Sequence, residues 1–304
     1  MHILSRLARR SSETARSGTG SGAGGRRGRA RRGQAGDDLT AANRSLVGIF
    51  AHPDDEALLA GGTLARYARE GARAAVIACT GGEAGDTRDP TVDTAQIPEV
   101  RREELRDACA RLGIRAVTIL DYRDSGVPAR GDPRSLVAAP LAQVAERIAA
   151  SLGPLAPDAV ITHDAAGGYG HPDHIRVHEA TTIAVRAMVR SPLLYHAVIP
   201  HRVVDDFARA FTQAGLRAGR AAAAGADMER DVGVPDDSVT TTIDVSAHVR
   251  AKRDAIRAHR TQMTDHVLFQ LPWAVLARLW SEEHFALAGA APVEGVSRDL
   301  FAAP

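Results

Sequence analysis

The chain has 304 residues, 44% of them hydrophobic, which is enough for one large domain with a sizeable core. Its net charge of +1 is unevenly divided. Residues 1–44 hold ten arginines and three acids, which leaves 28 basic and 34 acidic residues, a net charge of −6, for the rest. A mildly acidic body argues against nucleic acid as a partner, and the lack of a long apolar run argues against a membrane span.

The first 44 residues are rich in glycine, serine and arginine and have no hydrophobic periodicity, so we expect a disordered tail over 1–44 and a folded domain over 45–304. No apolar export segment follows the pair Arg9 and Arg10. Cys79 and Cys109 are too few for a disulfide framework. These features predict a cytoplasmic protein.

Strands and helices alternate from Leu46 onward. The expected strands cover 46–50, 74–79, 117–120 and 159–162, and the expected helices cover 56–70, 98–112, 136–152 and 172–189. This alternation predicts an α/β fold, a Rossmann-like, doubly wound and mainly parallel sheet over 45–190.

Beyond residue 190 the pattern is weaker. We expect strands over 193–199 and 239–245, a helix over 249–260 and helical or irregular structure over 205–230. Residues 191–304 are thus predicted to form a smaller C-terminal α+β part that completes the substrate pocket.

Two short histidine–aspartate boxes stand out. Residues 52–56 read His-Pro-Asp-Asp-Glu after the first strand, and residues 171–174 read His-Pro-Asp-His after the fourth. Segments 80–86 and 121–126 also follow strands. In open α/β sheets ligands bind beyond the carboxyl ends of the strands, so we expect all four segments to share one pocket.

The spacing within the boxes suits a metal ion. His52 and Asp55 are three residues apart, on one face of a helical first turn, while Asp54 is turned away and free to hold a water. His171 and His174 repeat this spacing. Two histidines and one carboxylate leave a position open, as a catalytic zinc site requires. The spacing does not decide which of His171 and His174 is the ligand, and each box alone could be an ordinary helix cap.

The chain resembles the PIG-L/LmbE-like family of zinc-dependent N-acetylglucosaminyl deacetylases. It shares the AHPDDE box, the HPDH box preceded by GGYG, a TGGE loop and an RDSG segment, over about residues 46–190. The likeness continues more loosely through HRTQ at 259–262 and EHF at 283–285. Within the family it is similar to the branch that deacetylates the GlcNAc-inositol precursor of mycothiol or cleaves mycothiol S-conjugates.

The resemblance implies a metal centre. His52, Asp55 and His174 would hold one divalent ion, zinc or ferrous iron, and Asp54 would be the general base for the attacking water. His163, which precedes the second box, is not expected to be a ligand, because three protein ligands suffice. The same reasoning applies to His178 in the helix that follows.

Further roles follow from the same resemblance. His171 would stabilise the oxyanion or act as general acid, with Asp173 orienting its imidazole, and Tyr169 would help to polarise the acyl carbonyl. Arg101 and Asp124 would hold sugar hydroxyls. The residues alone also permit purely structural interpretations. Arg101 could form an ion pair along its helix, and Asp124 could belong to an ordinary turn.

The activity implied is metal-dependent hydrolysis of the N-acetyl amide of an amino-sugar substrate. Alternatives are an amidase acting on a thiol conjugate, a deacetylase of an antibiotic intermediate, and a non-catalytic sugar-binding protein. A dinucleotide-dependent oxidoreductase is disfavoured, because the loop at 81–85 lacks the glycine fingerprint and follows the second strand. The sequence predicts no particular oligomeric state.

Overall fold

The computed structural model describes residues 41–85, 87–216, 232–290 and 295–302. Residues 1–40 of the predicted tail over 1–44, and part of the segment 205–230, lie outside the described residues. The described residues begin at 41, four positions before the expected start of the domain. Ala41 is buried, and the main-chain oxygen of Arg44 accepts a hydrogen bond from the N–H of Arg73 at 2.8 Å.

The described residues form a seven-stranded sheet in the order β3-β2-β1-β4-β5-β7-β6. The strands are β1 (Ser45–Phe50), β2 (Arg73–Thr80), β3 (Ala116–Tyr122), β4 (Ala159–His163), β5 (Leu193–Val198), β6 (Thr241–Asp244) and β7 (Glu282–Leu287). Strands β1 to β5 run parallel, whereas β7 is antiparallel to both β5 and β6. The predicted doubly wound, mainly parallel α/β fold is confirmed.

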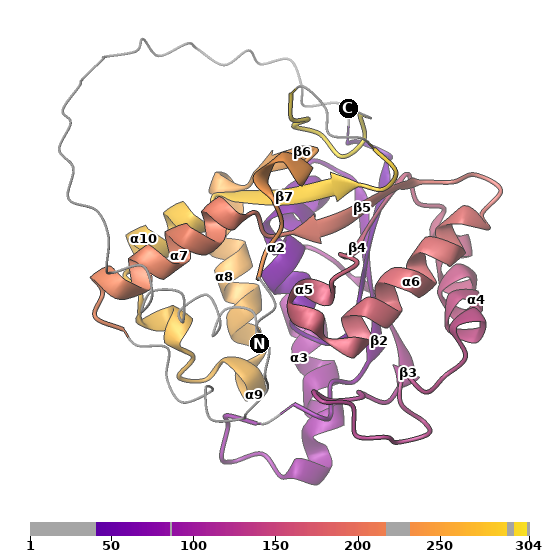
Figure 1. Cartoon of the computed structure of the whole chain (residues 1–304), viewed down its shortest axis with the longest axis horizontal. Helices are drawn as coiled ribbons and strands as arrows, with labels where there is room; N and C mark the ends of the chain where they lie inside the picture. Colours follow the sequence, from indigo (N-terminus) through magenta and orange to yellow (C-terminus); the bar gives the residue numbers. More distant parts are fainter. Residues whose placement is uncertain (1–40, 86, 217–231, 291–294, 303–304) are drawn as a thin grey trace.

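Helices cover both faces of this sheet (Figure 1). They are α2 (Asp55–Arg69), α3 (Ile97–Arg111), α4 (Leu141–Leu152), α5 (Gly167–Gly170), α6 (Pro172–Arg186), α7 (His201–Gln213), α8 (Val249–Ala258), α9 (Arg260–Met263) and α10 (Trp273–Leu279). Strand β1 is buried along its whole length, with Leu46 and Phe50 facing one core and Val47 and Ile49 the other. Helices α4 and α6 pack on one face, and α2, α3 and α8 pack together on the opposite face.

Some boundaries differ from the prediction for local reasons. Helix α4 begins at Leu141 rather than at 136, because Pro140 provides its N-cap and restricts the residue before it. Strand β7 was not among the predicted strands. It lies beside β5, and the sheet therefore runs continuously from the first half of the chain into residues 191–304. The proposed division near residue 190 stays a prediction.

The order of the strands fixes where a site can form. From β1 the chain proceeds outward through β2 and β3, and then returns to place β4 on the other side of β1. The carboxyl ends of β1 and β4 therefore flank the crevice at which an open α/β sheet binds its ligand. Among the described residues, none of the helices has the length and apolar character that crossing a membrane requires.

Candidate metal centre and active site

The first box forms a strained turn between β1 and α2. Asp54 has φ 116° and ψ −28°, a left-handed backbone that non-glycine residues seldom adopt, and Asp55 begins the helix. Such a conformation costs on the order of 1–3 kcal/mol and persists only where its surroundings enforce it. Here the N–H of Asp54 donates to Oε2 of Glu56 at 3.0 Å. The turn gives the two neighbouring aspartates different directions and different partners.

The second box follows β4 through a run of glycines. Gly167, Gly168 and Gly170 have φ values of 63°, 69° and 84°, which L side chains rarely adopt. The run delivers His171 to the N-cap of α6, where its Nδ1 accepts a hydrogen bond from the N–H of Asp173 at 3.1 Å. Nε2 is therefore the ring nitrogen of His171 that can contact a substrate or an ion.

Three side-chain atoms from the two boxes form a small triangle. His52 Nδ1 lies 3.4 Å from Asp55 Oδ2 and 3.3 Å from His174 Nε2, and His174 Nε2 lies 3.4 Å from Asp55 Oδ2. A tetrahedral zinc ion with bonds of about 2.0–2.1 Å separates its ligand atoms by about 3.3–3.4 Å. The three side chains are thus spaced as the ligands of one such ion, and all are buried.

Neighbouring groups hold this triangle in place. His52 Nε2 faces Asp173 Oδ2 at 3.2 Å and Asp124 Oδ1 at 3.5 Å, the arrangement of a carboxylate behind a metal-binding imidazole. Asp55 Oδ2 accepts the N–H of His52 at 2.9 Å. The orientation of the first two ligands is thereby fixed before any ion binds.

The third corner is held by ring packing instead. The His174 ring stacks between the rings of His163 and His171, with centroid separations of 3.9 and 4.6 Å. Its Nδ1 has no hydrogen-bond partner among the described residues. Stacking in this way fixes the plane of the ring and directs Nε2 at the triangle.

The carboxylates of the cluster favour positive charge at His52, whereas burial lowers the pKa of His174 and of His171. Burial alone would lower the pKa of His52, but the negative charge of Asp124, together with hydrogen bonds that His52 donates to carboxylate oxygens, outweighs it and raises that pKa well above the usual value. Burial would likewise raise the pKa of Asp55, yet the neighbouring imidazoles of His174 and His163 hold it well below its usual range. A divalent cation would meet the same negative field.

His163 offers a competing ligand set, because its Nε2, Asp55 and His174 also lie close together. However, His163 Nε2 accepts a hydrogen bond from the N–H of Ala51 at 3.0 Å and stands 3.5 Å from Asp55 Oδ2. Its lone pair is engaged, which favours the triangle with His52. His178 is further removed and contacts the main-chain oxygen of His163 at 3.0 Å.

Arg101 and Asp54 lie together next to Gly82, in the loop that follows β2. The guanidinium of Arg101 is 3.3 Å from Asp54 Oδ2, donates to the main-chain oxygens of Pro53 and Gly82, and is 3% exposed. In the structure this guanidinium holds the Asp54 carboxylate and the turn at Pro53, and its contact with a sugar hydroxyl stays a prediction.

Asp173 contacts two histidines in different ways. Its main-chain N–H donates to His171 Nδ1 at 3.1 Å, whereas its carboxylate accepts from His52 and from the N–H of Ser125 at 2.9 Å, and its predicted role in orienting the His171 imidazole stays a prediction. An N-cap residue meets the main chain of the residue two positions on, so the contact is made by the backbone. The carboxylate is left to support His52.

Asp124 and Tyr169 border the cluster. Asp124 accepts from the N–H groups of Ala84 and Gly126, at 3.2 and 2.8 Å, besides its contact with His52. Its predicted hold on a sugar hydroxyl competes with these three partners. Tyr169 is 4% exposed, and its ring stands edge-on to His171 with the centroids 5.8 Å apart.

Sequence reasoning missed a buried pair behind the first box. His259, at the junction of α8 and α9, places Nε2 2.8 Å from Oε1 of Glu56. Burial would lower the pKa of His259, but the Glu56 carboxylate outweighs it and raises that pKa. The sequence offers a hint only in that Glu56 closes one family motif and His259 opens another.

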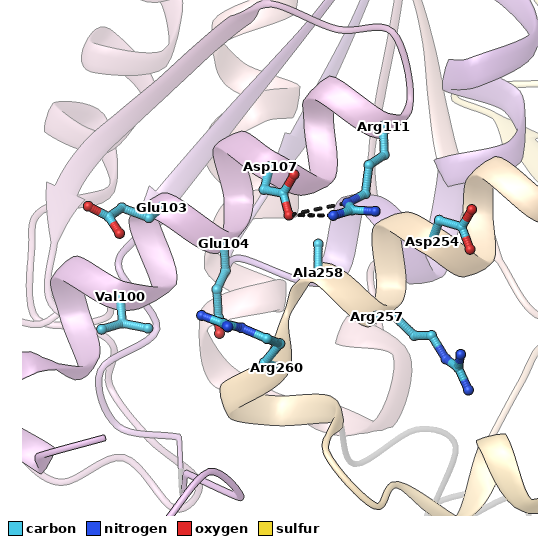
Figure 2. Close-up of a pocket in the computed structure, with 9 residues that line it drawn as sticks. All are labelled: Val100, Glu103, Glu104, Asp107, Arg111, Asp254, Arg257, Ala258 and Arg260. Atoms are coloured by element: carbon cyan, nitrogen blue, oxygen red, sulfur yellow. Dashed lines mark hydrogen bonds and ion pairs between the residues drawn. The ribbon is translucent and has the colours of Figure 1, made fainter. Parts of the chain in front are cut away.

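Another pocket, of about 450 Å³, lies between α3 and the junction of α8 and α9 (Figure 2). It is charged, and an ion pair between Asp107 and Arg111 crosses one side. Its lining includes Glu104, Arg257 and Arg260 but none of the predicted site residues. The pocket therefore does not displace the histidine cluster as the candidate site.

A Rossmann-like sheet with two histidines and a carboxylate gathered at its switch point defines an α/β protein whose His/Asp cluster could hold a divalent cation. Comparison with known proteins makes this class specific. A family model described as GlcNAc-PI de-N-acetylase, PIG-L, matches residues 47–185. The chain is 39% identical to a 1D-myo-inositol 2-acetamido-2-deoxy-alpha-D-glucopyranoside deacetylase of Actinosynnema mirum, over 86% of this chain and 98% of that protein. A relative of the same description from Kineococcus radiotolerans is 36% identical over 85% and 82%.

Solved structures agree on the fold. The N,N'-diacetylchitobiose deacetylase of Pyrococcus horikoshii is similar with a TM-score of 0.55 at 20% identity, covering 84% of this chain and 86% of that one. The 4-carboxy-2-hydroxymuconate hydratase of Pseudomonas putida also reaches 0.55, at 19% identity, covering 84% and 100%. The same fold thus hosts different chemistries. The curated relatives decide the matter, and the chain belongs to the PIG-L family of deacetylases.

Proposed function

We propose that this protein hydrolyses the N-acetyl amide of an N-acetylglucosamine-containing substrate, with one divalent ion held by His52, Asp55 and His174. The observation that carries the proposal is the triangle of ligand atoms, with edges of 3.3–3.4 Å, beside a buried Asp54. Zinc is the proposed ion, because two imidazoles and a carboxylate in a tetrahedral arrangement suit it. When bound, such an ion would polarise the amide carbonyl and lower the pKa of a coordinated water.

Asp54 is the proposed general base. It is adjacent in sequence to the ligand Asp55, and the turn at Asp54 sends its carboxylate to a separate position beside Arg101. A carboxylate placed there can take a proton from the attacking water and pass it toward the leaving amine. Arg101, 3.3 Å away, fixes where that carboxylate points.

His171 and Tyr169 are proposed to stabilise the acyl oxygen as negative charge develops on it. Because Nδ1 of His171 accepts the N–H of Asp173, a neutral His171 carries its proton on Nε2 and can donate it in a hydrogen bond. Of the two roles expected for His171, this geometry favours oxyanion stabilisation. Tyr169 stands next to His171 and would supply a second donor.

The proposed substrate is the GlcNAc-inositol compound named in the relatives' description, the N-acetyl precursor in the mycothiol pathway. Support comes from 39% identity that extends over 98% of the length of one such relative, including the C-terminal part. A cytoplasmic location belongs to the same proposal, because both cysteines are buried free thiols.

The test is incubation of the zinc-loaded protein with GlcNAc-inositol, N-acetylglucosamine and a mycothiol S-conjugate, with the free amine read by a fluorogenic reagent. We expect the GlcNAc-inositol compound to give the highest kcat/KM, and the Asp54→Asn variant to release little amine. Preferential cleavage of the S-conjugate would assign the chain to amidase activity instead. Absence of amine from all three substrates would contradict the proposal.

A further inference from the structure

The strained backbone of Asp54 is held from a distant part of the chain. Its N–H donates to Glu56 Oε2 at 3.0 Å, and the other carboxylate oxygen of Glu56 meets His259 Nε2 at 2.8 Å. Glu56 is 1% exposed and His259 is fully buried. A continuous hydrogen-bonded path therefore joins the α8–α9 junction to the main chain of the proposed base, through a contact between residues 203 positions apart, Glu56 and His259.

The α8–α9 junction is itself firmly placed. The main-chain oxygen of His259 accepts from the N–H groups of Gln262 and Met263, at 3.0 and 2.9 Å. Thr261 donates its N–H and its hydroxyl to Glu104, at 2.9 and 2.6 Å, and so ties the junction to α3. The neighbours of His259 in sequence line the pocket of Figure 2, while the imidazole points inward to Glu56.

We propose that Glu56 and His259 are a positioning pair for Asp54, which hold its left-handed backbone and thereby aim its carboxylate at the reacting water. The inference rests on the proposed function, in which Asp54 is the base. Neither side chain is assigned contact with the substrate or the ion. The Glu56 carboxylate accepts a hydrogen bond from the N–H of Asp54. His259 binds the other oxygen of that carboxylate and so prevents it from rotating away.

If Glu56 and His259 had only a structural role, substituting them would lower the stability of the protein without a specific effect on kcat. Breaking a buried hydrogen-bonded pair costs stability wherever it lies. A positioning role adds a specific consequence, because relaxation of the Asp54 turn would move the base relative to the water. A misplacement of about 1 Å at a catalytic group can cost on the order of 10²-fold in rate. The two roles are therefore distinguished by whether the loss of kcat depends on the presence of Asp54.

The experiment is a double-mutant cycle on the zinc-loaded full chain, with GlcNAc-inositol as substrate. His259→Leu should lower kcat by about 10- to 100-fold with KM within about twofold, at unchanged zinc content. In the Asp54→Asn background the same substitution should change the residual rate by less than about twofold, because its effect passes through Asp54. An equal loss in both backgrounds, or none in either, would overturn the inference. A fully active Asp54→Asn enzyme would instead overturn the proposed function.

If the His259→Leu variant does not fold, two polar substitutions of His259 provide the same test. In His259→Gln the side-chain amide can still reach Glu56, whereas in His259→Asn it is one carbon short. We expect kcat of the glutamine variant to exceed that of the asparagine variant at least about fivefold, and equal values would contradict positioning. His266→Leu is the matched control, since His266 is also buried and hydrogen-bonded but contacts Leu268 instead of the first box. It should lose stability while kcat is retained.

Discussion

At the scale of single residues, the first box assigns different tasks to two adjacent carboxylates. Asp55 faces His52 and His174, whereas Asp54, through its φ of 116°, faces Arg101. Asp54→Asn should therefore keep one zinc per chain and lose on the order of 10²–10⁴-fold in kcat, because a positioned base contributes about that much. Zinc content and steady-state kinetics of one preparation check this. Loss of zinc in Asp54→Asn together with its retention in Asp55→Asn would reverse the two assignments.

Spacing within the first box predicted that His52 and Asp55 come together, but spacing within the second box did not decide between His171 and His174. Nor could spacing predict the partners of these side chains. The support of His52 by Asp173, the burial of Arg101 against Asp54, and the contact between Glu56 and His259 all join segments far apart in the sequence. Such pairs depend on how helices pack across the sheet, which local periodicity does not record. In contrast, the sequence pattern was sufficient to predict that the site lies at the carboxyl ends of the strands.

At the scale of elements, α2 carries the proposed ligand Asp55 in its first turn and is tightly packed further along. A Cβ added at Gly62 would come within 2.6 Å of the Val245 side chain, whereas one at Gly61 would meet nothing nearer than 3.5 Å. Gly62→Ala should therefore destabilise the protein by about 1–3 kcal/mol through overpacking. Gly61→Ala should stabilise it by up to about 1 kcal/mol, since alanine favours the helix. Urea unfolding of both variants measures this, and equal effects would show that α2 can shift to relieve the contact.

The short helix Val267–Gln270 should make stability depend on pH. Its N-cap His266 accepts the N–H of Leu268, and burial with the nearby Arg88 lowers its pKa to about 4. The unfolded chain, with an ordinary pKa near 6.5, binds more protons between pH 6.5 and 4, so the contribution is fully present above that window and is lost as pH falls through it.

The comparison is between the wild type and His266→Asn, which keeps the cap without a titrating group. Between pH 6.5 and 4.5 the variant should lose less unfolding free energy than the wild type, by on the order of 1–3 kcal/mol. Denaturant titrations at the two pH values give the difference directly. Identical losses would mean that His266 titrates normally.

At the scale of the whole molecule, the described fold begins at Ala41. Removing residues 1–40 should leave the melting temperature and kcat/KM essentially unchanged, although it removes nine arginines. Removing residues 1–44 should cost about 1 kcal/mol more, because the hydrogen bond from Arg73 to the Arg44 oxygen and the ion pair with Asp158 at 3.4 Å go with it. Thermal melts of the two truncations test this, and equal melting temperatures would place the boundary after residue 44.

The larger architecture followed from alternation of strands and helices, because a buried parallel sheet imposes continuous apolar runs such as β1. Strand β7 escaped prediction, since Glu282, Glu283 and His284 make it look like a polar surface segment. Glu283 is in fact buried, where it accepts from Lys252 at 2.6 Å and from the N–H groups of Gly62 and Thr63. Polar residues with such partners do not follow the hydrophobic pattern on which strand prediction relies.

The central claim is that His52, Asp55 and His174 hold one divalent ion, and metal content per chain tests it most directly. Wild-type protein, His174→Ala and His171→Ala are loaded with zinc, freed of excess and analysed for zinc by mass spectrometry. The account predicts about one zinc per chain in the wild type and in His171→Ala, and almost none in His174→Ala, because only His174 completes the triangle of 3.3–3.4 Å edges. Full zinc in His174→Ala, with loss in His171→Ala, would contradict it.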